Sequence, residues 1–434
     1  MIFLSIAHAF VCFTVLIIAF FAIRNQKSSI LSLTVVGFIL LDSISLSYIP
    51  YFDLSNIPYL DNPEFLINDL DADRYSSQIF SHWIFLSISS LLLFFQSKST
   101  NEHYRKNISF RSSIVISLFA LGLISTARYM FLGPGLEILL TTQISFASTS
   151  DAIASRSLLR EKIENGQGAY LASLSSKIIF PLFASYIIYS GNKYKYAWWG
   201  LCSMLSLVYA IQTREKAPVV LSLLLYIAIL LWGNLTKSGL LKSALSQYLK
   251  AISIASIVFI VSGTAIYSVN FGLTPTVAIQ SILLRTLAVP GATETNFFEV
   301  FPKDFRYRGL HKIFKMPLTP GSSSASDTSI YEVATTATGR TFASNASIVA
   351  VAWSGAGYFG VGIISSILFS ILFFIDGRFK KFDPNIHSLA MYLSIPSLLG
   401  LTSGGFADYT TWGGILLPAI VLGVLVSKNS EEVN

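Results

Sequence analysis

Arginine side chains in apolar surroundings are the first sign of chemistry in this sequence. Arg214 and Lys216 lie in a short turn, Gln212–Pro218, between two apolar runs. A guanidinium group can bind phosphate oxygens through two parallel hydrogen bonds. A helix that begins at Pro218 would direct its free backbone N–H groups at the same anion. The turn therefore predicts a phosphate-binding site.

Two further arginines stand near apolar segments later in the chain. Arg285 lies in a mostly apolar stretch, so it needs a partner, which is either a substrate phosphate or a buried Glu294 or Glu299. Arg340 precedes another apolar run and is followed by Asn345. We expect Arg285 to act on the same anion as Arg214, and Arg340 and Asn345 to bind substrate.

Other cations mix with aromatic or polar residues. Arg306 and Arg308 alternate with aromatic side chains, which suits sugar rings and phosphates, but equally an amphipathic helix among lipid headgroups. Arg156 and Arg160 lie in a segment, 151–164, that predicts a short surface helix with an Asp cap. These four arginines are candidates for substrate binding.

Composition decides what kind of protein must position these residues. The chain has 434 residues, of which 53% are hydrophobic and only 12% are charged, whereas soluble domains carry about 25% charged residues. This excludes a soluble globular protein and predicts an all-α polytopic membrane protein, with residues 1–434 forming one integral membrane domain. Eleven apolar runs predict transmembrane helices: Ile2–Ile23, Ile30–Pro50, Ile79–Gln96, Ser113–Leu132, Tyr170–Ser190, Ala197–Gln212, Ala217–Asn234, Ala251–Phe271, Gly357–Ile375, Ile386–Gly404 and Trp412–Ser427.

The distribution of cations predicts the orientation. Half of the thirty Lys and Arg residues fall in alternate connections, around residues 24–27, 98–111, 193–195, 237–250 and 378–381 and at Lys428. Cytoplasmic loops hold such an excess, so we expect an external amino terminus and a cytoplasmic carboxyl terminus. The two longest connections, 133–169 and 272–356, are then external, and the second is the expected catalytic loop.

The sixth run, Ala197–Gln212, is short for a membrane span. At about 1.5 Å per residue it covers about 24 Å, less than the hydrocarbon thickness of about 30 Å. The turn with Arg214 and Lys216 is therefore expected to be recessed and to face a cavity or a partner. The alternative is that both cations extend to the interface and pair with Glu215.

If the chemistry is glycosyl transfer, a base must take the proton of the attacking sugar hydroxyl. The candidates on the external side are Glu294, Glu299, Asp304, His311 and Glu332. The sequence does not choose among them.

Two weaker patterns have ordinary explanations. Asp69, Asp71 and Asp73 alternate and could hold a divalent cation if the segment is extended, but external loops are often acidic. The spacing of glycines in Gly355–Gly360 matches a dinucleotide loop, yet no strand precedes it. We interpret it as a closely packed helix start.

The arrangement resembles the bacterial O-antigen or oligosaccharide repeat-unit polymerases of the Wzy type. The resemblance covers most of the chain as topology: a first long external loop after the fourth span, an arginine turn between two mid-chain spans, and a larger external loop before the last three. At residue level it rests on 211–214, on 285–308, and on 345–378, which runs from Asn345 through Gly355–Gly360 to Arg378.

The resemblance implies a membrane glycosyltransferase architecture of the GT-C type. It implies a metal-independent polymerase in the inner membrane, with undecaprenyl-pyrophosphate-linked oligosaccharide as donor and acceptor, no cofactor and no nucleic-acid partner. A protein that regulates chain length is a further expected partner. Arg214 and Arg285 would stabilise the pyrophosphate leaving group, and Glu299, His311 and Glu332 are expected in the catalytic set.

Three alternatives remain open. An O-antigen ligase shares the membrane plan and donor, and His311 is compatible with it. A metal-dependent polyprenyl-phosphate glycosyltransferase would need Asp71 or Asp73. A flippase or other transporter would place polar residues at the membrane midplane and often has repeated halves, and neither feature is evident from the sequence.

Overall fold

The computed structural model of the chain is almost entirely helical. It describes residues 1–24, 30–51, 72–98, 108–140, 168–212, 221–230, 272–310, 330–339, 347–379, 389–401 and 426–428, apart from 288, 391 and 399, and a few positions between 219 and 268. Its main elements are α1 (Ile2–Arg24), α2 (Ile30–Leu41), η1 (Ser43–Ser47), η2 (Ile49–Tyr51), α3 (Ala72–Lys98), β1 (Ile108–Phe110), α4 (Ser112–Phe131), α5 (Gly135–Leu140), α7 (Ala169–Leu174), η4 (Ser175–Ile179), α8 (Phe180–Tyr189), α9 (Lys195–Gln212), α12 (Pro275–Leu287), α13 (Val289–Val300), α15 (Ile330–Thr338), α16 (Ile348–Phe379), η5 (Ile395–Leu398) and β2 (Val426–Lys428).

Six helical segments in the described part of the chain are long and apolar enough to cross a membrane. They are Ile2–Ala22, Ile30–Tyr51, Ala72–Gln96, Ser112–Phe131, Ala169–Tyr189 and Ile348–Phe379. On α1, Phe3, Phe10 and Phe13 are 85, 71 and 63% exposed, as expected of side chains that face lipid. Apolar helices of sufficient length therefore occur where the first five expected spans and the ninth lie.

The other expected spans are reproduced less completely. The sixth coincides with α9, which is helical but is not among the six apolar segments, and the seventh contains the shorter apolar helix Leu221–Leu230. The tenth includes the 3-10 helix η5, where Pro396 has no N–H to donate. The eighth and eleventh lie almost entirely outside the described residues.

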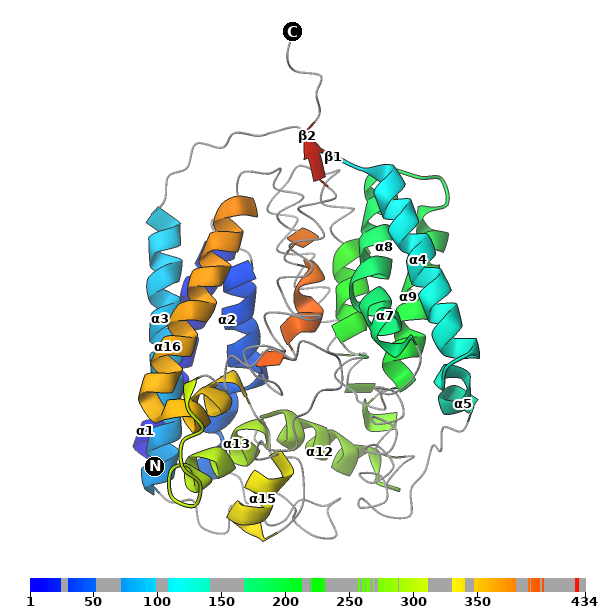
Figure 1. The fold of residues 1–434 in the computed structure, drawn as a ribbon. Helices are drawn as coiled ribbons and strands as arrows, with labels where there is room; N and C mark the ends of the chain where they lie inside the picture. The colour runs from blue at the N-terminus through cyan, green and yellow to red at the C-terminus, as the bar shows by residue number, and fades with distance from the viewer. Residues whose placement is uncertain are drawn as a thin grey trace.

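The long helices form two groups, which stand beside each other in Figure 1. The α3 group contains α1, α2, α3 and α16, and the α8 group contains α4, α7, α8 and α9. Helix α2 is apolar on all sides and mostly buried, so it is the central helix of the α3 group. The π-helical turn η4 joins α7 to α8 without a break in direction.

Two ends of the molecule can be distinguished. At one, the β1 end, β1 pairs antiparallel with β2, so that the connection between α3 and α4 meets residues 426–428. At the same end Asp376 of α16 accepts hydrogen bonds from the backbone N–H groups of Ile30 and Leu31, both at 3.0 Å. The connection between α8 and α9 also lies there (Figure 1). These connections belong to the Lys- and Arg-rich set that the sequence places on the cytoplasmic side, and they therefore lie at the same end of the molecule.

At the opposite end, the α13 end, short helices lie across the ends of the long ones (Figure 1). These are α12, α13 and α15, all from the second long connection. Helix α16 already begins at Ile348, so the expected span start at Gly357 is too late. The expectation failed because Ala356 and Gly357 interrupt the helix with φ of −162° and 60°, and the sequence pattern marks this interruption as a helix start.

Candidate functional site

Three ionisable side chains meet inside the α13 end of the α3 group. Asp42 follows α2, His82 lies on α3 and Glu294 lies on α13, and all three are 0% exposed. One nitrogen or carboxylate oxygen of each lies within 4.8 Å of the other two. We call these residues the buried cluster. Asp42 and His82 belong to candidate membrane spans, where an ionisable residue is a functional candidate by default.

Glu294 is held by three donors. Its Oε2 accepts hydrogen bonds from Gln78 Nε2 at 2.9 Å and from His82 Nε2 at 3.0 Å, and its Oε1 accepts one from the Ser347 hydroxyl. Burial alone would raise the pKa of Glu294, but His82, Ser347 and Gln78 together lower it below the usual range. The three donors therefore favour the charged form of Glu294 inside the protein.

A chain of hydrogen bonds continues from His82 to α1. His82 Nδ1 lies 3.0 Å from the Ser43 hydroxyl. Trp83 Nε1 donates to His8 Nδ1 at 3.0 Å, so the other nitrogen of His8 carries the proton and donates to the Ser43 carbonyl at 2.8 Å. The network thus links α1, η1, α3, α13 and the start of α16.

Gly291 allows α13 to lie close enough to η1 for these contacts. A Cβ at this position would lie 2.5 Å from Ser45 Oγ and 2.6 Å from a methyl group of Leu46. Gln78 Nε2 also donates to the Gly291 carbonyl at 3.0 Å, and Gln78 Oε1 accepts from Thr295 at 2.8 Å. The side chain of Gln78 therefore fixes both the backbone of α13 and the Glu294 carboxylate.

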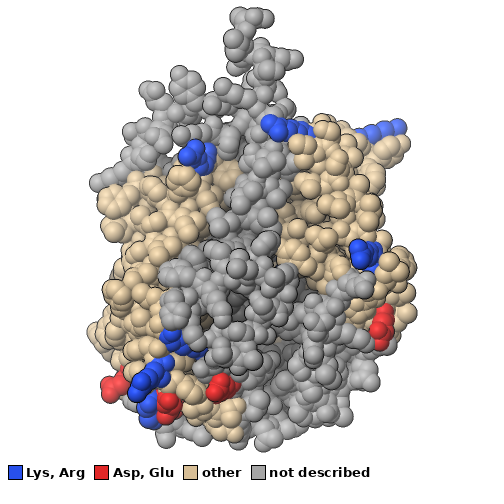
Figure 2. Space-filling model, in the orientation of Figure 1, with Lys and Arg blue, Asp and Glu red and all other residues tan. Residues whose placement is uncertain are grey.

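The outward side of α13 carries a different carboxylate. Glu299 forms an ion pair of 2.8 Å with Arg74, and the two side chains are 21% and 24% exposed. Burial raises the pKa of Glu299, although Arg74 and Lys303 oppose the change. In the face shown in Figure 2, basic and acidic side chains lie next to one another at this end of the molecule.

The segment after α13 packs against the broken start of α16. Arg308 and Gly309 donate backbone hydrogen bonds to the carbonyl groups of Ser354 and Gly355, both at 2.9 Å. The Arg308 guanidinium lies 5.1 Å from the centre of the Phe301 ring, which is a cation–π distance.

Gly357 has a φ of 60°, and a Cβ there would lie 2.9 Å from the Tyr307 hydroxyl. This approach and the unusual backbone explain why glycine occupies the position. The close packing expected of Gly355–Gly360 is present, but the segment interrupts α16 and does not begin it.

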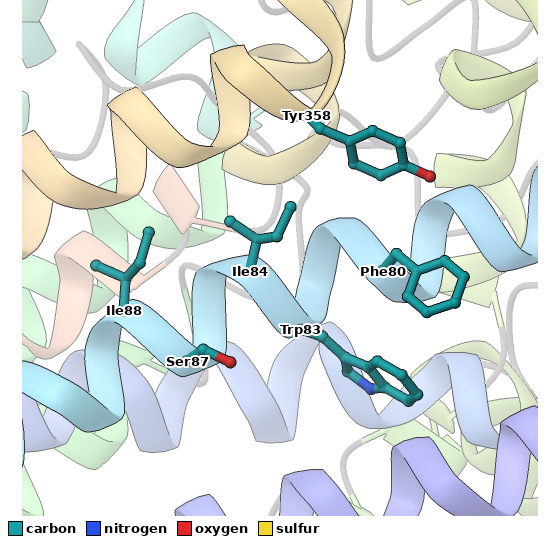
Figure 3. Close-up of a pocket in the computed structure, with 6 residues that line it drawn as sticks. All are labelled: Phe80, Trp83, Ile84, Ser87, Ile88 and Tyr358. Carbon is teal, nitrogen blue, oxygen red and sulfur yellow. The ribbon is translucent and has the colours of Figure 1, made fainter.

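An apolar hollow of about 590 Å³ lies between α3 and α16. Figure 3 shows Trp83 and Phe80 on one wall and Tyr358 on the other. Its lining consists of Phe80, Trp83, Ile84, Ser87, Ile88 and Tyr358. Since Trp83 also donates to His8, one side chain connects this hollow to the hydrogen-bond network.

The structure describes only some of the residues that the sequence selected. Glu299, Arg306 and Arg308 lie at the α13 end, with Arg306 exposed, and Glu332 is exposed on α15. Arg285 lies on α12, and its side chain is outside the described part. The remaining selected residues lie outside the described residues: Arg156, Arg160, Arg214, Lys216, His311, Arg340 and Asn345.

The start of the predicted arginine turn is visible at Gln212. Its Nε2 donates to the Gly135 carbonyl at 3.1 Å, and the residue is 2% exposed. Glu294, which the sequence offered as a base or as a partner of Arg285, is bound to His82.

Sequence reasoning missed the buried cluster as a unit. Asp42 follows an uninterrupted apolar run and His82 lies inside one. An ionisable residue in such a position indicates a functional site, so these two residues could have been selected from the sequence. Asp42, His82 and His8 lie close together within the candidate spans Ile30–Tyr51, Ala72–Gln96 and Ile2–Ala22. The residues are far apart in the chain, so only the packing of α1, α2 and α3 brings them together.

No family model, curated protein or solved structure matches this chain.

Proposed function

We propose that the protein is a membrane glycosyltransferase that joins polyprenyl-pyrophosphate-linked oligosaccharide repeat units into O-antigen or a related surface polysaccharide. The observation that carries this proposal is the α13 end. There, helices α12, α13 and α15 cover the ends of apolar spans, and basic and aromatic side chains of residues 301–308 lie against the start of α16. A lipid-linked pyrophosphate needs both an apolar environment and cations at its surface.

The membrane arrangement is part of the same proposal. We propose eleven spans in a GT-C-like architecture in the bacterial inner membrane, with a periplasmic amino terminus and a cytoplasmic carboxyl terminus. The β1–β2 pairing and the contact of Asp376 with the start of α2 support it, because both join connections that are rich in Lys and Arg. The α13 end would then face the periplasm.

The geometry favours Glu299 among the candidate bases. Its side chain is partly exposed and paired with Arg74, and a raised pKa makes a carboxylate a better proton acceptor. Glu294 is fully buried and bound by three donors, so it is unsuited to reach a sugar hydroxyl. Arg308 and Arg306, together with Arg214 and Arg285, would stabilise charge on the departing pyrophosphate.

The test is the surface glycan of a strain that lacks the gene, complemented with variants and resolved on a gel. We expect Arg214→Ala and Arg308→Ala to lose the ladder of long chains while single lipid-linked repeats remain. Arg378→Ala is the matched control, because Arg378 lies over the Phe374 ring at 4.9 Å at the β1 end. Normal long chains from Arg214→Ala and Arg308→Ala would contradict the proposal.

A second candidate is a lipid-linked oligosaccharide flippase or another transporter, which the buried cluster favours because it sets ionisable groups inside candidate spans. The same gel separates the candidates. A polymerase deletion retains one repeat on the core, whereas a ligase or flippase deletion loses every repeat.

A further inference from the structure

The buried cluster carries more negative charge than its own side chains balance. Asp42 and Glu294 are carboxylates, and His82 offers at most one positive charge, while Gln78 and Ser347, the other donors to Glu294, are neutral. All three members of the cluster are 0% exposed. Two carboxylates this close repel each other strongly when burial lowers the local dielectric constant. A cation bound between them would offset this repulsion.

We propose that Asp42, His82 and Glu294 bind one divalent metal ion. One imidazole nitrogen and two carboxylate oxygens are ligands that Zn²⁺ and Mn²⁺ accept. With a neutral imidazole, the charge of the three ligands is balanced by a doubly charged ion. This site goes beyond the proposed glycosyl transfer and does not depend on it.

The spacing of the ligand atoms agrees with a shared coordination sphere. His82 Nε2 and Glu294 Oε2 are 3.0 Å apart, and two atoms that each lie about 2.1 Å from one zinc ion are separated by about 3.4 Å in tetrahedral geometry. Asp42 completes a set in which every ligand-type atom lies within 4.8 Å of the others. A small movement of the side chains would bring all three onto one ion.

The neighbours of the cluster orient the ligands as the outer shell of a metal site does. Ser43 Oγ contacts His82 Nδ1 at 3.0 Å, which leaves Nε2 directed at Glu294 and Asp42. Gln78 and Ser347 hold the Glu294 carboxylate from two sides. A hydrogen bond to the second ring nitrogen and a fixed carboxylate are typical of metal ligands.

The experiment measures metal in the full-length protein purified in detergent, without reference to glycan synthesis. After treatment with a chelator, the protein is titrated with Zn²⁺ or Mn²⁺, and bound metal and the midpoint of thermal unfolding are measured. We expect one equivalent of bound metal and a rise in the midpoint, because an ion that binds only the folded state stabilises it.

Variants identify the site. Asp42→Asn and Glu294→Gln keep the shape of the side chains and remove a charged ligand, so at least a tenfold loss of metal affinity is expected. Glu299→Gln lies on the same helix and pairs with Arg74 outside the cluster, and it is expected to retain the metal. Ser43→Ala is expected to weaken binding about ten- to a hundredfold through His82.

Two results would overturn the proposal. One is a wild-type protein that takes up less than a tenth of an equivalent of either ion and shows no change in its unfolding midpoint. The other is unchanged affinity in Asp42→Asn or Glu294→Gln. If these two variants do not fold, Ser43→Ala decides, since an affinity equal to that of the wild type would contradict the orientation of His82 by Ser43 on which the proposed site depends.

Discussion

The helices of the α3 group and those of the α8 group are held together by different kinds of buried side chain. In the α3 group, His8, His82 and Asp42 are buried and joined through Ser43 and Glu294. In the α8 group the buried surface is aromatic, and the rings of Phe119 and Phe183 stack with centres 3.8 Å apart. Apolar side chains gain little by leaving lipid for a helix interface, so packing and hydrogen bonds must hold membrane helices together.

Two buried polar contacts of the α8 group are neutral. Tyr226 donates to the Cys202 carbonyl at 2.9 Å, and Ser206 donates to the Ser176 carbonyl at 2.8 Å. These hydroxyl groups each need a single acceptor and introduce no charge. In the part of the chain that the structure describes, the cluster of Asp42, His82 and Glu294 thus lies where the helices of the α13 end cover it, which is where a function that uses charge would lie.

Replacing His82 tests the polar side of this comparison and should have the largest effect. His82→Phe leaves the Glu294 carboxylate buried without its imidazole partner, and loss of one member of a buried pair destabilises by about 3 to 5 kcal/mol. The free energy of unfolding in detergent measures it. The double variant with Glu294→Leu should recover part of the loss, because no charge is stranded at position 294. A double variant less stable than His82→Phe would contradict the role given to the pair.

Replacing Phe183 tests the aromatic side. Phe183→Ala removes a ring that stacks on Phe119 and meets the edge of Trp198 at 5.6 Å, so a loss of about 3 kcal/mol is expected. Phe131→Ala is the control, because this ring is 74% exposed at the end of α4, and it should change the free energy of unfolding little. Equal losses in both variants would mean that the stacked rings do not carry the packing of the α8 group.

Asp376 offers the smallest test, again in the α3 group. Its carboxylate accepts from two backbone N–H groups at the start of α2, which are otherwise unsatisfied and lie at the positive end of the helix dipole. Asp376→Asn replaces one acceptor oxygen with a donor and should reduce stability by about 1 kcal/mol. Asp304→Asn is the matched exposed control. If the two variants melted at the same temperature, the contact between α16 and α2 would not be stabilising.

The agreement between sequence and structure is greatest for long helices. The spans that begin at Ile2, Ile30 and Ser112 follow from continuous apolar runs, because each must satisfy its backbone groups internally in lipid. The start of α16 was misplaced because the backbone break at Gly357, where Tyr307 approaches closely, is a tertiary feature. Arg308 and Glu299 were selected from their residue type, but their contacts with Phe301 and Arg74 were not predictable from spacing.

By itself, the sequence determined that this is a helical protein for a membrane and that its charges are unequally distributed between alternate connections, since hydrophobic length and cation counts are local properties of the chain. Only the tertiary structure decided which of its ionisable residues meet. Asp42, His82 and Glu294 come from three distant segments, and their approach depends on Gly291 and on the packing of α13 across η1 and α3. Contacts between residues that are far apart in the sequence depend on how the helices pack, and a local sequence pattern does not determine this packing.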